Sequence, residues 1–149
     1  MKRRASSEPP VATSRGTADK MVEKRKRQLL LLADDDPELI GILVKRLQVL
    51  ECDIITTSNG ADALSLVKEK KPDAVILDVM MPQMNGWEVC KKIRSDAEIG
   101  KTPVMMLTGI GESLNEMTSP LYGADDHIDK PFNFSELLFK IRKLLANPR

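Results

Sequence analysis

The sequence predicts an α/β fold built on an open parallel sheet. After Gln28, short apolar runs typical of buried strands alternate five times with segments of helical periodicity, which is the signature of βαβ units. Four of the apolar runs end on polar residues, and ligands bind such sheets in the crevice at the carboxyl ends of the strands. No apolar run exceeds five residues, against the roughly 20 needed to cross a bilayer, so we expect no transmembrane segment.

Each element follows from the apolar pattern and from the residues that interrupt it. The first helix illustrates the argument, because Pro37 suits a first helical turn and Leu39, Leu43 and Leu47 recur on one face. We expect strands at 29–33, 53–57, 74–78, 103–107 and 125–129, and helices at 37–50, 60–70, 86–95, 112–121 and 134–146.

Caps and breakers define the helix ends. Asn59 and Ser135 are expected to be N-caps, and Pro72 and Gly100 are expected to mark helix ends. Pro120 falls inside the fourth predicted helix, where a proline costs about 3 kcal/mol. We therefore expect that helix to be short, kinked or mobile.

Charge and composition divide the chain into two parts. Residues 1–28 hold nine Lys or Arg against three Asp or Glu and lack a sustained apolar period, so we expect a disordered basic extension followed by one folded domain over 29–147. Clustered basic residues can attach to nucleic acid or an acidic surface, but a solvated extension is the favoured interpretation. Nothing marks the chain for export, and Cys52 and Cys90 lie in apolar segments, so a reducing cytoplasm is expected.

The polar residues at the predicted strand ends suit phosphoryl chemistry. Asp34, Asp35 and Asp78 offer the carboxylate oxygens that Mg²⁺ prefers, with Mn²⁺ as an alternative ion. One carboxylate in such a site can act as a nucleophile and form an acyl phosphate, and we assign that role to Asp78. Thr108 and Lys130 would donate a hydroxyl and an ammonium to the transferred group. Three carboxylates in one crevice also repel each other, so metal binding should depend on the charge of the site.

Four segments closely resemble the receiver domain of bacterial two-component response regulators, of the single-domain kind that is similar to chemotaxis regulators. These segments are 31–37 (Leu-Leu-Ala-Asp-Asp-Asp-Pro), 76–86 (Ile-Leu-Asp-Val-Met-Met-Pro-Gln-Met-Asn-Gly), 106–109 (Met-Leu-Thr-Gly) and 123–132 (Gly-Ala-Asp-Asp-His-Ile-Asp-Lys-Pro-Phe). The resemblance covers about residues 28–147, and Thr108 and Lys130 lie 30 and 52 residues after Asp78, as in that family. It implies a flavodoxin-like doubly wound sheet of five strands in the order 2-1-3-4-5, with five helices.

The resemblance also implies roles for single residues. Asp78 corresponds to the phosphoacceptor, Asp34 and Asp35 to the acidic metal pair, and Met80 to a donor of a backbone carbonyl to the metal. Thr108 and Lys130 correspond to the pair that senses the phosphoryl group. Such domains take phosphate from a histidine kinase or a histidine phosphotransfer protein and change the surface around the fourth helix, fifth strand and fifth helix for a downstream protein.

His127 and Pro120 depart from the family pattern, and Pro120 falls in the helix that relays the switch. His127 stands three residues before Lys130, where an aromatic residue that moves with phosphorylation is usual. An imidazole titrates near physiological pH, so switching through His127 is expected to be pH-sensitive or weak.

Two further functions remain open. His127 and Pro120 are consistent with a pseudo-receiver, a constitutive protein-interaction module that performs no phosphotransfer. A phosphatase-type hydrolase is ranked last, because Val79 and Met80 follow Asp78 where a general acid would be needed, and no cap insertion is visible. We expect the protein to turn over no separate substrate. We also expect the chain to be either a stand-alone receiver or a receiver taken from a longer protein.

Overall fold

Five parallel strands form one sheet in the order β2-β1-β3-β4-β5 in the computed structural model, which describes residues 27–109 and 123–146. The strands are β1 (Leu29–Ala33), β2 (Asp53–Thr57), β3 (Ala74–Asp78), β4 (Val104–Thr108) and β5 (Asp126–Asp129). The predicted fold class and strand order are confirmed. Only β4, shifted by one residue, and β5, which begins one residue later, differ from the predicted bounds.

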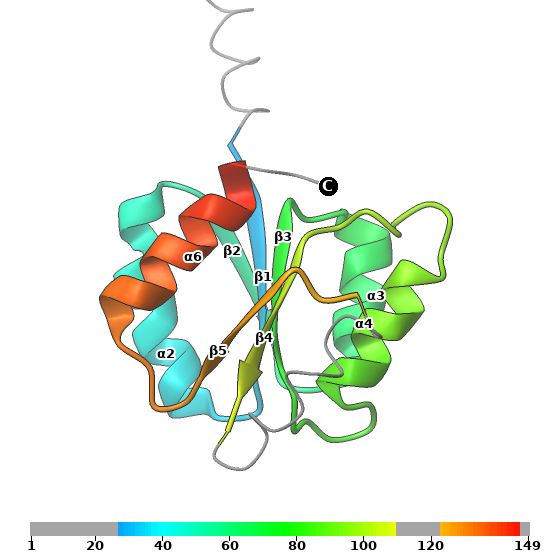
Figure 1. Ribbon diagram of the computed structural model, residues 1–149, viewed down its shortest axis with the longest axis horizontal. Coiled ribbons are helices and arrows are strands. Elements are labelled where there is room, and N and C mark those ends of the chain that lie inside the picture. The colour runs from blue at the N-terminus through cyan, green and yellow to red at the C-terminus, as the bar shows by residue number, and fades with distance from the viewer. Residues whose placement is uncertain (1–26, 110–122, 147–149) are drawn as a thin grey trace, which may run out of the picture.

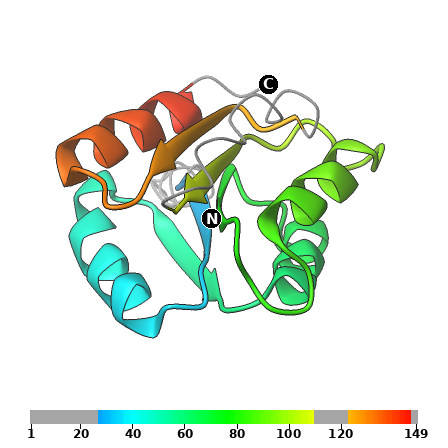
Figure 2. The same ribbon diagram turned by 60° about the horizontal axis from the view of Figure 1, so that its bottom comes forward.

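Helices cover both faces of the sheet, with α2 and α6 on one side and α3 and α4 on the other (Figures 1 and 2). Their bounds are α2 (Pro37–Arg46), η1 (Leu47–Leu50), α3 (Gly60–Lys70), α4 (Gly86–Arg94) and α6 (Phe134–Ala146). The predicted helix 112–121, including Pro120, lies outside the described residues, as does most of the basic extension. Within the described ranges, no helix is long and apolar enough to span a membrane.

The first predicted helix, 37–50, is α-helical only to Arg46. The last turn is a 3₁₀ helix, η1, whose tighter bonds end at Glu51, where φ is 55° and the Glu51 N–H donates to the Gln48 carbonyl. Apolar periodicity alone does not distinguish the two helix types, because both place Leu43 and Leu47 against the sheet.

Most of the predicted caps are confirmed. Asn59 caps α3, and α3 ends before Pro72. The Ser135 prediction is wrong, because α6 begins at Phe134 and the Asn133 side chain accepts from the Glu136 N–H at 3.2 Å. Gly100 does not end α4 either, since that helix ends six residues earlier at Arg94.

Two apolar layers hold the sheet between its helices. The layer under α3 and α4 includes Leu31 and Leu77, and the layer under α2 and α6 includes Leu32 and Ile76, so alternate residues of β1 and β3 face opposite sides. All residues of β3 and β4 are buried, as expected for central strands of a parallel sheet. The packing of the sheet therefore positions the residues at the ends of these strands, Asp78 and Thr108.

Gly86 allows the loop after β3 to return to the sheet. Its N–H donates to the Val79 carbonyl at 2.8 Å, and a Cβ at this position would lie 2.4 Å from the Asp78 carbonyl oxygen. Asn85 and Glu88 form a capping box that starts α4 at this point. The Met-Asn-Gly sequence therefore places the start of α4 directly against the backbone of Asp78.

Candidate functional site

Three aspartates meet where β1 and β3 end. Asp34 follows β1 and Asp78 ends β3, the neighbouring strand, so the sheet brings them together across 44 residues of sequence. One carboxylate oxygen from each of Asp34, Asp35 and Asp78 lies within 4.8 Å of the others. Asp34 and Asp78 are only 2% and 5% exposed, whereas Asp35 is open to solvent.

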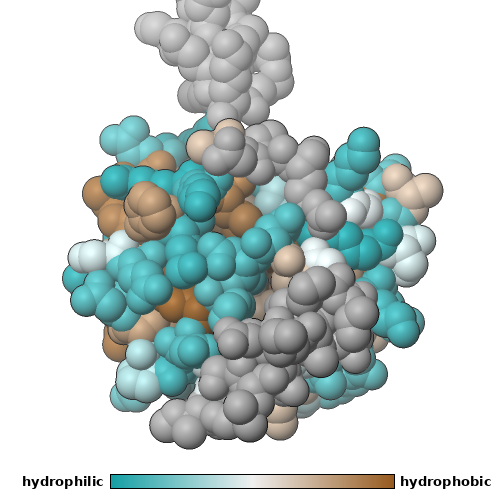
Figure 3. Space-filling model, in the orientation of Figure 1, coloured by the Kyte–Doolittle hydropathy of each residue, from teal (hydrophilic) through white to brown (hydrophobic). Residues whose placement is uncertain are grey.

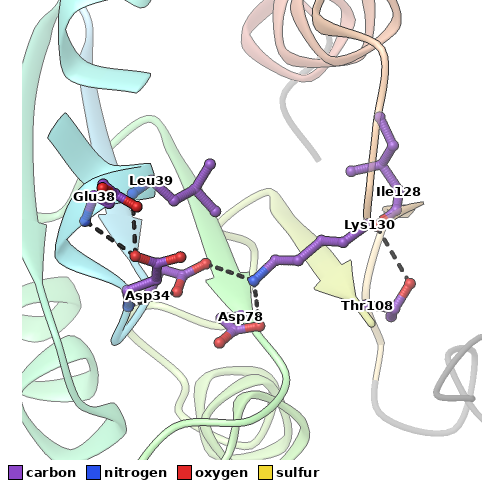
Figure 4. Close-up of polar contacts among 8 residues, drawn as sticks. Asp34, Glu38, Leu39, Asp78, Thr108, Ile128 and Lys130 are labelled. Carbon is purple, nitrogen blue, oxygen red and sulfur yellow. Dashed lines mark hydrogen bonds and ion pairs between the residues drawn. The ribbon is translucent and has the colours of Figure 1, made fainter. Parts of the chain in front are cut away.

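Lys130 extends across the sheet edge to two of these carboxylates. Its Nζ lies 2.9 Å from Asp34 Oδ2 and 3.2 Å from Asp78 Oδ1 (Figure 4). It follows β5 directly, and the peptide bond from Lys130 to Pro131 is cis. The three carboxylates and the single ammonium leave a net negative site that is open on the Asp35 side.

The site shifts the protonation of Asp78. Burial, and then the charges of Asp34 and Asp35, raise the pKa of the Asp78 carboxyl to about 6, although Lys130 acts in the opposite direction. Burial alone would lower the pKa of the Lys130 ammonium, but its hydrogen bond and charge interaction with Asp34, followed by those with Asp78, raise it overall. A cation in addition to Lys130 would therefore stabilise the fully ionised form of the site.

Thr108 lies near the site, but its hydroxyl is directed to β5. The side chain is 1% exposed, and its Oγ1 donates to the Ile128 carbonyl at 3.2 Å (Figure 4). The Asp129 carboxylate is an alternative acceptor for the same hydroxyl. Among the contacts of the described residues, none joins this hydroxyl to Asp78 or Lys130. The structure thus brings together four of the five predicted polar residues, and places Thr108 beside them with its donor turned away.

Met80 and His127 occupy positions at the edge of this arrangement. Met80 follows Asp78 by two residues, and its side chain is 62% exposed, so the side chain does not fill the site. The His127 ring is half-buried on β5, where His127 stands opposite Met106 of β4. The roles given to both residues remain predictions.

Asp129 was not singled out in the sequence. It lies directly before Lys130 and opposite Thr108 in the parallel register of β4 and β5. An acidic residue adjacent to the lysine was the available signal, but only the strand register shows which side chain it meets.

The carboxylate cluster fits a hard divalent cation. All three groups supply oxygen, which is the donor that Mg²⁺ prefers, and two carboxylates with water and a phosphoryl oxygen would suffice. The raised pKa of Asp78, which comes first from burial and then from the charges of Asp34 and Asp35, is consistent with a site that gains from a bound cation.

The family model of the response regulator receiver domain matches residues 30–142. This chain belongs to that family. The match includes each of the three clustered aspartates and Lys130, and the predicted membership in two-component signal transduction is confirmed.

Curated relatives agree with this assignment. The protein named "Probable transcriptional regulator ycf27" is 37% identical to this receiver domain over 124 residues in Guillardia theta, covering 83% of the chain and 48% of the relative. The Galdieria sulphuraria protein of the same name is 38% identical over 121 residues, covering 81% of the chain and 46% of the relative. The chain spans about half the length of these relatives. It is also 33% identical over 138 residues to "Histidine kinase P4" of Formosa agariphila, covering 93% of the chain and 10% of that protein.

Solved receiver structures share the fold. The chemotaxis response regulator CheY4 of Vibrio cholerae superposes with a TM-score of 0.74 at 28% identity, covering 80% of this chain and all of the other. The BeF₃-activated N-terminal receiver domain of RstA from Klebsiella pneumoniae gives a TM-score of 0.72 at 28% identity, covering 80% and 99%.

Proposed function

We propose that this receiver domain is a phosphorylation switch in which Asp78 accepts a phosphoryl group from a histidine kinase or a histidine phosphotransfer protein. The observation that carries the proposal is the position of Asp78, which is buried, flanked by two aspartates and bonded to Lys130 at 3.2 Å. A carboxylate held in this way can be phosphorylated to an acyl phosphate while a lysine neutralises the added charge.

The transfer step would use the Asp78 carboxylate as the nucleophile. One carboxylate oxygen forms the bond to phosphorus while the bond from phosphorus to the imidazole nitrogen of phosphohistidine breaks, and the imidazole leaves with that electron pair. Lys130 now shares its ammonium between Asp34 and Asp78, and it could turn to the new phosphoryl oxygens without leaving the site. Thr108 would donate its hydroxyl to the same group after rotating away from β5.

Asp34, Asp35 and Asp78 are the residues proposed to hold Mg²⁺, with the Met80 carbonyl as a further oxygen donor. When bound, the ion would supply the positive charge that allows the phosphoryl oxygens to approach three carboxylates. The receiver domain of the sensor histidine kinase PA1611 from Pseudomonas aeruginosa, 21% identical with a TM-score of 0.73, holds a magnesium ion in its active-site cleft. At this identity the likeness concerns the fold, so the carboxylates carry the proposal for this chain.

The output would be contact with a downstream protein over the surface that includes β5 and α6. The view in Figure 3 shows apolar side chains among hydrophilic ones on the side formed by α2 and α6. Phe139 of α6 is 66% exposed and offers an apolar contact to such a partner. We also propose that the chain divides into a basic extension (1–28) and a receiver (29–147), and that it acts in the cytoplasm. The proposed switch turns over no separate substrate.

The test is labelling of the purified chain with acetyl phosphate, followed by mass mapping of the modified residue. We expect one Mg²⁺-dependent phosphoryl group on Asp78 and none in Asp78→Asn. Glu69→Gln is the matched control, because it makes the same change at an exposed position of α3 and should label normally. If Asp78→Asn were labelled, the phosphoryl group would be on a residue other than Asp78. If neither acetyl phosphate nor a kinase labelled the wild type, a constitutive interaction module would be favoured.

A further inference from the structure

In this structure the Thr108 hydroxyl contacts two acceptors on β5. The hydroxyl lies 3.2 Å from the Ile128 carbonyl and also meets the Asp129 carboxylate. A hydroxyl carries one proton, so it donates to a group on β5 or to a phosphoryl group on Asp78, but not to both at once. Turning toward Asp78 requires that the bond to β5 break.

The sheet register explains why Asp129 reaches this hydroxyl. Thr108 and Asp129 are direct partners in the parallel pairing of β4 and β5, so their side chains leave the sheet on the same side. The Thr108 hydroxyl is buried, whereas the Asp129 side chain reaches it from an exposed position. The next residue, Lys130, follows β5 and engages Asp34 and Asp78.

We propose that Asp129 is a positioning residue that holds the Thr108 hydroxyl on β5 and so opposes the activated arrangement until Asp78 is phosphorylated. The proposal rests on the proposed function, because it concerns the state in which Thr108 serves Asp78. A carboxylate makes a stronger acceptor than the neutral Ile128 carbonyl, since a charge-assisted hydrogen bond is roughly twice as strong as a neutral one. Removing the carboxylate therefore leaves the weaker acceptor and shifts the population toward the arrangement that binds a phosphoryl group.

The proposal predicts an increase in affinity for a phosphoryl mimic. The probe is beryllofluoride with Mg²⁺, titrated against the full chain. We expect Asp129→Ala to bind it about 3- to 10-fold more tightly than the wild type and Asp129→Asn to fall between them, because the amide oxygen is a neutral acceptor. Glu136→Ala is the control for lost negative charge, since Glu136 is exposed in the first turn of α6, and its affinity should stay within twofold of the wild type.

A double-mutant cycle separates this role from a structural one. In a Thr108→Val background there is no hydroxyl to hold, so Asp129→Ala should change the affinity by less than twofold. An effect that persists in this background, or no effect of Asp129→Ala in the wild type, would overturn the proposal.

A second readout does not depend on phosphoryl binding. In the apo protein, the ¹³C methyl resonance and χ1 rotamer populations of Thr108 should change in Asp129→Ala and stay unchanged in Glu136→Ala. If the wild type failed to bind beryllofluoride, the proposed function would be in doubt while this measurement would still decide the role of Asp129. An unchanged Thr108 rotamer in Asp129→Ala would overturn the inference even if Asp78 were labelled normally.

Discussion

Lys130 Nζ lies 2.9 Å from Asp34 Oδ2, although 96 residues separate them in the sequence. Lys130 follows β5 and Asp34 follows β1, and these strands have β3 and β4 between them in the sheet, so the long lysine side chain spans this gap. The Asp34 side chain is 1% exposed and that of Lys130 is 28% exposed. This ion pair therefore connects a buried anion to a cation that keeps access to the open side of the site.

Lys130→Met should destabilise the protein when divalent cations are absent. It leaves the buried Asp34 carboxylate without its ammonium partner, and we expect a loss of about 1–3 kcal/mol at pH 8, less than for a fully buried pair because the lysine is partly exposed. Urea unfolding in EDTA measures the loss, and Mg²⁺ should reduce it. Lys71→Met is the control, since its ion pair with Glu98 is exposed and should contribute less than about 0.5 kcal/mol. Equal losses in the two variants would contradict the role given to Lys130.

Asp78→Asn should make the protein more stable at neutral pH without metal. The pKa of Asp78 is about 6 in the folded chain against 3.8 for an ordinary aspartate, so the folded state binds more protons than the unfolded state between these values. The stability linked to this proton is present below pH 4 and is lost as the pH rises through 6. At pH 7.5 in EDTA we expect the asparagine variant to exceed the wild type by about 1–2 kcal/mol, with the difference vanishing near pH 4. Urea titrations from pH 4 to 8 measure this, and a difference that is constant with pH would refute it.

Asp34→Asn should weaken Mg²⁺ binding by about tenfold or more, because it replaces one of the buried carboxylates in the cluster by a neutral amide. Calorimetric titration of the unphosphorylated chain measures the affinity. Asp36→Asn is a matched control two residues away. Asp36 caps α2 by accepting from the Glu38 and Leu39 N–H groups, and asparagine is an equally good cap, so its Mg²⁺ affinity should stay within about twofold. If both variants lost affinity equally, the metal assignment to Asp34 would fail.

The strand ends were predictable from the sequence, and the directions of the polar side chains there were not. Apolar runs with a polar end place Asp34 and Asp78 at the same sheet edge, because adjacent parallel strands end together. The direction of the Thr108 hydroxyl depends instead on its partner across the β4–β5 register, Asp129, which a linear pattern does not give. The Ser135 prediction failed for a similar reason, since both Asn133 and Ser135 can cap a helix and only the backbone bonds decide between them.

Gly86→Ala should disturb the site through the backbone of Asp78. The added Cβ would lie 2.4 Å from the Asp78 carbonyl oxygen and 2.6 Å from the Met106 side chain, and the first of these is backbone in a central strand that cannot move aside easily. We expect a loss of stability of about 1–3 kcal/mol, as for other forced close contacts, together with weaker Mg²⁺ binding. Thermal unfolding and the same calorimetric titration measure the two effects.

Gly41→Ala tests whether that loss comes from the close contact or from replacing a helical glycine. Gly41 lies in α2, and a Cβ there would meet nothing within 4 Å. Because alanine is the better helix former, this variant should gain about 0.5–1 kcal/mol and bind Mg²⁺ as the wild type does. If Gly86→Ala lost stability and Gly41→Ala gained it, the loss would come from the close contact with the Asp78 carbonyl oxygen and not from replacing a glycine by alanine. If Gly86→Ala left the stability unchanged, the loop after β3 could shift without moving Asp78.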